Sequence, residues 1–334
     1  MVAIVRLWHR VCLGMGTMAM LGAGPSGVAS AQASDSYPAR PVRMVVSYAP
    51  GNVTDTLARF IAENLAEKWK QPVAVENKQG LGGSLGAQSV VNAPADGYVL
   101  LFSAMAAMAI NPHVYQNIGY DALKDFTPIV NVAYPESAMV VTPSLGVRTV
   151  PELVEYSKAN PNALNYGTAG NGTVPHLNTE ALKTITGLRA QHVPYKAASA
   201  VLTDLLGGRI QMQQESLSVL LPHIESGKLI VLATGASKRL EQLPDVPTLT
   251  EIYPEYKPVI PWLGIFAPAG TPDPIVRRIN RDVVEILQRP DIRGKLRAQS
   301  LNPVGDSPEE FARAIAGNYD HLGKLVQALG LKAD

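Results

Sequence analysis

Cysteine is almost absent from this chain, and so is an excess of either charge. The one cysteine among 334 residues is Cys12, and 29 lysines and arginines stand against 28 aspartates and glutamates. A formal net charge of +1 lacks the basic field of a nucleic-acid binder, so we expect no nucleic-acid partner. The fractions of hydrophobic and charged residues, 46% and 17%, are those of a globular protein long enough for two domains.

The first 33 residues have the pattern of a secretory signal peptide. Arg6 and Arg10 precede an apolar run over residues 11–21, and Ala31-Gln32-Ala33 follows it. The run is too short for the roughly 20 residues that span a bilayer. We predict cleavage after Ala33 and a periplasmic mature protein. Cleavage would also remove Cys12, which excludes disulfides, cysteine nucleophiles and a lipid anchor.

The predicted mature chain lacks the motifs of nucleotide and zinc chemistry. It contains no G-x-G-x-x-G, P-loop, H-E-x-x-H or C-x-x-C pattern. His176 and Glu180 have the spacing of two metal ligands on a helix, but no third ligand stands nearby. We therefore expect neither a cofactor nor a metal site.

The stretch from Ala49 to Asp55 joins a strand directly to a helix. Residues 42–48 carry Met44, Val45 and Val46 together, which is typical of a strand buried on both faces. Pro50 and Gly51 interrupt it, and Thr54 or Asp55 is predicted to cap a helix whose apolar residues recur at positions 57, 60, 61 and 65. The free N–H groups and the dipole at such a helix start favour an anion.

The same strand–loop–helix plan recurs along the chain. Strands are predicted over residues 73–76 and 98–102, and a second series over 129–134, 138–141, 164–166, 190–195, 210–214 and 229–234. An extended segment at 262–267 leads to helices over 274–287, 291–299 and 308–329. This alternation predicts two α/β domains, 34–133 with 266–334 and 134–265, joined by two crossover segments.

Several spaced motifs occur in order over essentially the whole mature chain. They include Thr54-Asp55, Ala95-Asp96-Gly97-Tyr98, Tyr120-Asp121, Gly170-Asn171-Gly172, His192-Val193-Pro194-Tyr195 and Pro244-Asp245-Val246-Pro247-Thr248. In these the chain resembles the periplasmic receptors of tripartite tricarboxylate transporters, often called Bug-type receptors. The resemblance implies a two-lobe Venus-flytrap binding protein of type II-like fold, each lobe a mixed sheet flanked by helices. It also implies a carboxylate ligand and membrane permease subunits as partners; we expect a monomer and no enzymatic activity.

A hydrolase is the alternative function. Gly82-Gly83-Ser84-Leu85-Gly86 matches the G-x-S-x-G nucleophile elbow, in which Ser84 would be the nucleophile of an esterase. A nucleophile elbow follows its strand directly, however, and residues 77–81 intervene here. The pattern therefore favours the receptor.

Candidate ligand contacts are placed at strand ends and helix starts. They are Asn52, Val53, Thr54, Asp55, Ser84, Ser103, Met105, Thr168, Ala169, Asn171, Thr173, His176, Ser199 and Glu215. Helix capping is the alternative role for Thr54 and Asp55, and a purely structural role is the alternative for Glu215. The family usually has two more glycines where this chain has Asn52 and Val53, which changes the space beside the ligand.

The predicted cleft loops also constrain the ligand. In loops 49–55, 103–108, 167–176 and 194–199 the only lysine or arginine is Lys196, so mainly backbone N–H groups, hydroxyls and amides must hold a carboxylate. Two opposed loops indicate two anionic ends. Candidate apolar walls, Met105, Met108, Tyr134 and Trp262, favour an aliphatic or aromatic dicarboxylate over citrate, whose hydroxyl would lack a partner, and over amino acids.

Overall fold

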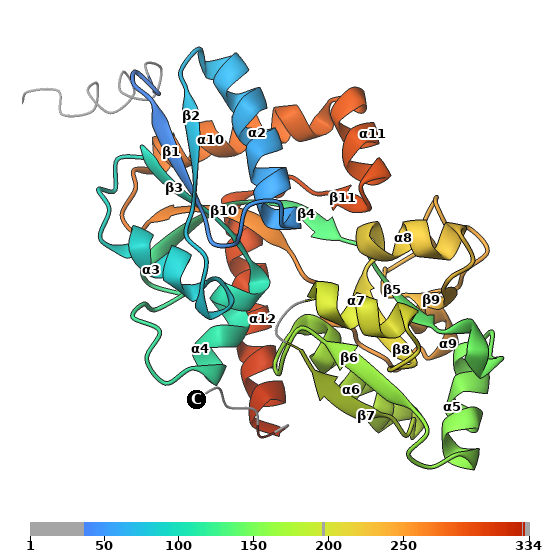
Figure 1. Cartoon of the computed structure of the whole chain (residues 1–334). Helices are drawn as coiled ribbons and strands as arrows, with labels where there is room; N and C mark the ends of the chain where they lie inside the picture. Colours follow the sequence, from blue (N-terminus) through green and yellow to red (C-terminus); the bar gives the residue numbers. More distant parts are fainter. Residues whose placement is uncertain (1–36, 196–197, 329, 331–334) are drawn as a thin grey trace, which may run out of the picture.

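Two mixed sheets, each covered by helices, make up the protein (Figure 1). The structure is a computed structural model, and it describes residues 37–195, 198–328 and 330. The predicted signal peptide and Lys196 lie outside these residues. The two-sheet α/β architecture predicted from the alternation of strands and helices is confirmed.

The first sheet has the strand order β11-β4-β10-β3-β1-β2. Its strands are β1 (Val42–Val46), β2 (Val73–Asn77), β3 (Val99–Ala104), β4 (Phe126–Pro135), β10 (Leu263–Pro268) and β11 (Leu301–Pro303). β1 pairs in parallel with β2 and β3, and β10 lies antiparallel between β3 and β4. Met44, Val45 and Val46 are consecutive apolar residues because both faces of this sheet are buried, and each is 0% exposed.

Helices cover both faces of the first sheet. They are α2 (Val53–Trp69), α3 (Ser84–Val91), α4 (Asn111–Val114), α10 (Asp273–Gln288), α11 (Pro290–Ala298) and α12 (Pro308–Ala328). Helices α2, α10 and α11 share one apolar core with Met44 and Val46, whereas α3 and α12 share another with Val45. Successive residues of one strand thus enter different cores, because side chains alternate across a strand.

The second sheet has the order β7-β6-β8-β5-β9. Its strands are β5 (Ser137–Val141), β6 (Asn165–Thr168), β7 (Gln191–Pro194), β8 (Met212–Ser216) and β9 (Ile230–Thr234), and its helices are α5 (Val150–Ala159), α6 (Val174–Thr186), α7 (Ala198–Leu206), α8 (Leu217–Glu225) and α9 (Leu249–Ile252). Helices α5 and α6 pack with Met139 on one face, and α7 and α8 pack with Val140 on the other.

The chain passes between the sheets at two places. β4 leads into β5 through Glu136, whose N–H donates to the Ser300 carbonyl of the first lobe (2.9 Å) and whose carbonyl accepts from the Leu217 N–H of the second (2.8 Å). The return segment ends at Trp262, whose carbonyl accepts from the Met105 N–H at 3.1 Å. The lobe boundaries predicted at 134 and 265 fall inside β4 and β10, next to these links, and the exact division stays a prediction.

The start of α2 differs from the prediction in one detail. Its N-cap is Asn52, whose side-chain oxygen accepts from the Thr54 N–H at 2.8 Å. Thr54 and Asp55, the predicted caps, lie in the first turn instead. The reason is that Asn competes well for the cap position and is the first polar side chain after the glycine turn. The helical segment 106–114 and strand β11 were not predicted at all.

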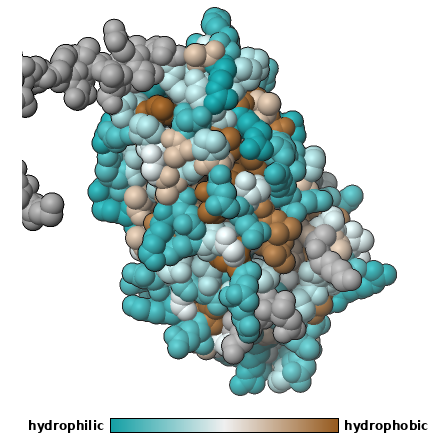
Figure 2. Space-filling model, turned by 90° about the vertical axis from the view of Figure 1, so that its left-hand side faces the viewer, coloured by the Kyte–Doolittle hydropathy of each residue, from teal (hydrophilic) through white to brown (hydrophobic). Residues whose placement is uncertain are grey.

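The surface shown in Figure 2 carries hydrophobic residues in small patches among hydrophilic ones. No helix in the described part of the chain is long and apolar enough to cross a membrane.

Candidate functional site

A cavity of about 210 Å³ lies between the two lobes. Both sheets and both links contribute to its wall, so a molecule bound there would touch both lobes. The lining residues are Tyr48, Asn52, Val53, Thr54, Ala104, Pro135, Glu136, Ser137, Val174, Pro175, Asn178, Gln214, Glu215, Ser216, Pro261 and Leu263.

Three helices begin at this cavity. Residues from the starts of α2 (Asn52 to Thr54) and α6 (Val174 and Pro175) line it, and so does Ser216, the N-cap of α8. The N-cap side chains of α6 and α8 accept no capping hydrogen bond from a backbone N–H of their own helix. The positive ends of three helix dipoles therefore converge on one space, which favours an anion.

Two carboxyl groups line the same cavity, and no lysine or arginine does so within the described residues. Burial raises the pKa of Glu136 to about 7, an effect that nearby Lys238 partly opposes. Burial also raises the pKa of Glu215, although the Ser216 N–H and the Gln213 amide donate to it. Both acids are thus protonated more readily than a surface glutamate, which reduces their repulsion of an anion.

Asp55 shapes the loop before α2 and does not line the cavity. One carboxylate oxygen accepts from the Gly51 N–H at 2.8 Å, and the other accepts from the Asn77 amide at 2.7 Å. Arg59, one turn further along α2, also donates to the Asp55 carboxylate and forms an ion pair with it. Burial alone would raise the pKa of Asp55, but the hydrogen bonds from Arg59, Asn77 and Gly51 outweigh it and lower the pKa. Asp55 therefore fixes Asn52 and Val53 beside the cavity.

The loop before α6 is braced in a similar way. The hydroxyls of Thr168 and Thr173 both donate to the Gly170 carbonyl, at 2.9 and 3.0 Å. The Gly172 N–H donates to Nδ1 of His176 at 3.1 Å, and the His176 ring stacks on His192 with centroids 4.0 Å apart. The predicted contacts Thr168, Ala169, Asn171, Thr173 and His176 lie in or beside this loop, and none of them lines the cavity.

The histidine stack makes stability depend on pH. Burial and the neighbouring His176 lower the pKa of His192 to about 4, below the ordinary value of 6.5. The unfolded chain therefore binds more protons than the folded one between these values, so stability is complete above pH 6.5 and falls as the pH approaches 4. We expect the melting temperature to drop over this interval, and to drop less in His192→Gln. An equal drop in both proteins would contradict the assignment.

The remaining predicted contacts are distributed as follows. Asn52, Val53, Thr54 and Glu215 line the cavity as expected. Ser103 is fully buried and accepts a hydrogen bond from Ser47. Met105 and Met108 belong to an apolar core at 1% and 0% exposure, and Ser199 is exposed on α7. Tyr134 and Trp262 line a different cavity, of about 370 Å³.

Several lining residues were missed by sequence reasoning. Tyr48 and Ser216 end their strands at the cavity, so the rule that named Ser103 would also have found them. Ser137, Asn178 and Gln214 lie at a strand start, within a helix and within a strand. No local signal distinguishes them from core residues.

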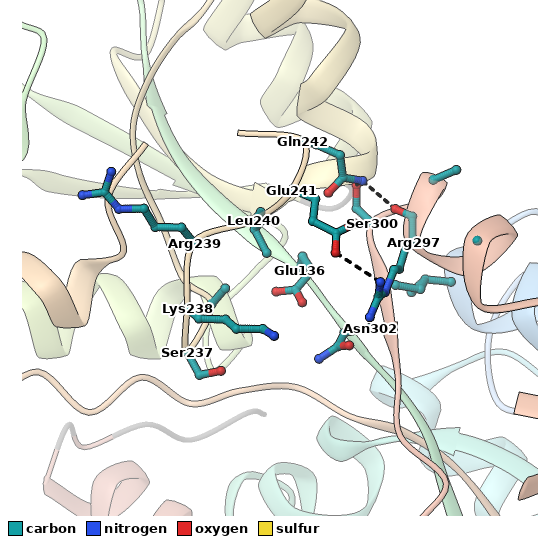
Figure 3. Close-up of a pocket in the computed structure, with 14 residues that line it drawn as sticks. Glu136, Ser237, Lys238, Arg239, Leu240, Glu241, Gln242, Arg297, Ser300 and Asn302 are labelled. Atoms are coloured by element: carbon teal, nitrogen blue, oxygen red, sulfur yellow. Dashed lines mark hydrogen bonds and ion pairs between the residues drawn. The ribbon is translucent and has the colours of Figure 1, made fainter. Parts of the chain in front are cut away.

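A further cavity, of about 400 Å³, lies beside the link at Glu136 (Figure 3). It opens between the loop 236–242 of the second lobe and the end of α11, and Glu136 lines it too. Gln242 donates to the carbonyl of Arg297, and the Arg297 guanidinium pairs with Glu241 at 3.1 Å. Lys238, Arg239 and Arg297 line this cavity as well as Glu136 and Glu241, and the α11 residues in its wall belong to the C-terminal half of that helix. Among the described residues, no group of three or more histidines, cysteines or acids is placed to hold a metal ion.

Comparison with known proteins decides the family. The model of the tripartite tricarboxylate transporter family receptor matches residues 57–331. The chain belongs to this receptor family. The receptor is 34% identical to protein BugT of Bordetella pertussis (strain Tohama I) over 309 residues, which cover 92% of this chain and 94% of BugT.

Solved structures agree with this assignment. The R. palustris protein Rpa4515 with adipate has a TM-score of 0.80 and 34% identity, over 89% of the receptor and 99% of that chain. MatC from Rhodopseudomonas palustris with bound malate has a TM-score of 0.73 and 28% identity, and the match covers 87% of the receptor and 100% of the MatC chain. The predicted Venus-flytrap fold is confirmed by these likenesses.

The family consists of solute receptors and not of enzymes, so the esterase alternative is wrong. The surroundings of Ser84 give the physical reason. Its side chain is 0% exposed, and it accepts from the Asn111 amide at 2.9 Å and from the Tyr120 hydroxyl at 3.2 Å. No histidine among the described residues bonds to it. Ser84 joins α3 to the segment around Asn111.

Proposed function

We propose that this receptor binds a small dicarboxylate, aliphatic or aromatic, in the 210 Å³ cavity. It would then deliver the ligand to the membrane permease subunits of a tripartite transporter. The observation that carries the proposal is the convergence of three helix N-termini, from both lobes, on this one cavity. The adipate and malate named for two related structures support the same ligand class.

Each ligand carboxylate would accept from N–H groups at a helix start. A charge-assisted hydrogen bond of this kind contributes about 1.5 to 3 kcal/mol. The α2 start lies in the first lobe, and the α6 and α8 starts lie in the second, so a molecule with two anionic ends is held by both lobes. Val53, Ala104 and Leu263 supply an apolar wall for its carbon chain.

Ligand binding is expected to close the lobes about the two links. Rotation there would bring the loop 167–173 toward the ligand, which would give Thr168 and Asn171 the contact role that the sequence predicts. The predicted signal peptide, the periplasmic location and a monomeric state belong to the same proposal.

Calorimetric titration tests the ligand class. Purified receptor without residues 1–33 is titrated with aliphatic and aromatic dicarboxylates, citrate, aspartate and glutamate. We expect saturable binding of at least one dicarboxylate, with a dissociation constant in the micromolar range or below. Tight binding of citrate or an amino acid without any dicarboxylate response would overturn the ligand class and leave the receptor assignment intact.

A further inference from the structure

Gln214 is a buried polar side chain with no hydrogen bond. It lies in β8, between β6 and β5, and is 2% exposed. Among the described residues, neither its amide oxygen nor its amide nitrogen has a partner in hydrogen-bond geometry. Buried polar groups are nearly always paired, and an unpaired one destabilises the folded protein. The sheet therefore retains Gln214 at the expense of stability.

The polar groups around Gln214 are engaged elsewhere. The hydroxyl of Tyr256 donates to the Asn178 carbonyl at 3.2 Å. The Gln214 amide lies near this hydroxyl and slightly opposes the rise in the Tyr256 pKa that burial causes, but it is outside hydrogen-bond geometry. Both amide atoms of Asn178 bond to the backbone of Val259, at 2.7 and 3.0 Å. A Cβ atom at Gly235 would lie 3.2 Å from the Gln214 amide nitrogen, so the backbone of Gly235 closes this side. No group among the described residues of the second lobe donates to the Gln214 amide oxygen.

Gln214 lines the 210 Å³ cavity, in which we propose that the ligand binds. Gln214 lines this cavity and neither of the other two. Ser137, on the same face of the neighbouring strand, lines it as well. Gln214 thus lies at the floor of the cavity, out of reach of bulk water and beside the starts of α6 and α8.

We propose that Gln214 determines ligand specificity by pairing with a dicarboxylate that carries a hydroxyl next to one carboxylate. This inference rests on the proposed function and deepens it. The amide nitrogen would donate to a carboxylate oxygen, and the amide oxygen would accept from the adjacent hydroxyl. A plain dicarboxylate satisfies only the nitrogen and leaves the buried oxygen unpaired, which is the situation that gives strong discrimination. The predicted cleft loops contained no expected partner for a hydroxyl of the ligand. In this proposal the amide oxygen of Gln214, in strand β8, is that partner.

A hydroxyl fits this place better than an ammonium group. An ammonium has three donors and a full charge, whereas Gln214 offers one neutral acceptor. Two acids line the cavity, Glu136 and Glu215, and burial favours the neutral form of both. The side chain of Glu215, the next residue in the chain, leaves the other face of β8, because side chains alternate along a strand. Its two carboxylate oxygens already accept from Ser216 and Gln213.

The test compares matched ligand pairs on the mature receptor. Calorimetry is run with succinate and malate, glutarate and 2-hydroxyglutarate, adipate and 2-hydroxyadipate, and with aspartate. We expect the hydroxylated member of the bound pair to bind about tenfold or more tightly in wild type. In Gln214→Met, which keeps the length and removes the polar atoms, the ratio should fall to about one.

Asn131→Leu is the matched control. Asn131, in β4 of the first lobe, is also a buried amide, at 0% exposure, but it does not line the cavity. It should keep the wild-type ratio. Ligand-free Gln214→Met should melt at or above the wild-type temperature, because it loses an unpaired group, and this distinguishes lost recognition from misfolding. Equal binding within pairs in wild type, an unchanged ratio in Gln214→Met, or a preference for aspartate would overturn the proposal. Binding of an aromatic dicarboxylate without any of these pairs would also overturn the proposal, whereas failure of every dicarboxylate, aliphatic or aromatic, would overturn the dicarboxylate function itself.

Discussion

Replacing Asp55 by alanine is expected to weaken dicarboxylate binding at least tenfold and to lower the free energy of unfolding by about 2 to 3 kcal/mol. The side chain is 3% exposed and satisfies the Gly51 N–H and the Asn77 amide as well as Arg59. Without it these donors lose a buried charged acceptor, and the loop that places Asn52 and Val53 beside the cavity is released. Urea denaturation and calorimetry measure the two effects.

Asp273→Ala is the matched control for this prediction. Asp273 also lies in the first turn of a helix and also pairs with the arginine four residues later, at 2.7 Å, but its side chain is 68% exposed. Exposed ion pairs contribute little to stability, so we expect Asp273→Ala to change the free energy of unfolding by less than about 0.5 kcal/mol and to leave dicarboxylate binding unchanged. If both variants behaved alike, the role of Asp55 would be that of an ordinary ion pair, and the loop would owe its shape to other contacts.

Replacing Gly86 by alanine is expected to destabilise the receptor by about 3 kcal/mol, although only one methyl group is added. An added Cβ would lie 2.6 Å from the Cα of Ser47 and 2.8 Å from the carbonyl oxygen of Lys78. Both are backbone atoms that no rotamer change can move away. Helix α3 would have to withdraw from the end of β1, where the loop to α2 begins, so ligand affinity should fall as well.

Gly317→Ala in α12 separates this packing effect from helix propensity. Gly317 is exposed, and an added Cβ there would meet nothing within 4 Å. Alanine should leave the free energy of unfolding unchanged or raise it by up to about 1 kcal/mol. If alanine lowers the free energy of unfolding at Gly86 and does not lower it at Gly317, the result supports the close approach of α3 to β1. A mild effect at Gly86, below about 1 kcal/mol, would show that the helix adjusts freely.

The sequence by itself determined the local elements, the order of the two series and the family. A buried strand, a glycine turn and a helix start are decided by neighbouring residues, so β1, α2 and the anion-favouring start at Asn52 to Thr54 are readable from a short stretch. The spacing of the motifs likewise indicated the receptor family, because motif spacing is read from the sequence without coordinates.

Only the tertiary structure decided which side chains face the ligand. Asp55 and Thr54 are adjacent at a helix start, yet Thr54 lines the cavity, while Asp55 is held by Asn77, 22 residues further along the chain. Gln213 and Gln214 are both buried glutamines of one strand, and only packing against α6 and the second link places Gln214 at the cavity. Such choices depend on contacts between distant segments, because a polar side chain turns toward whichever partner the fold brings within hydrogen-bond reach.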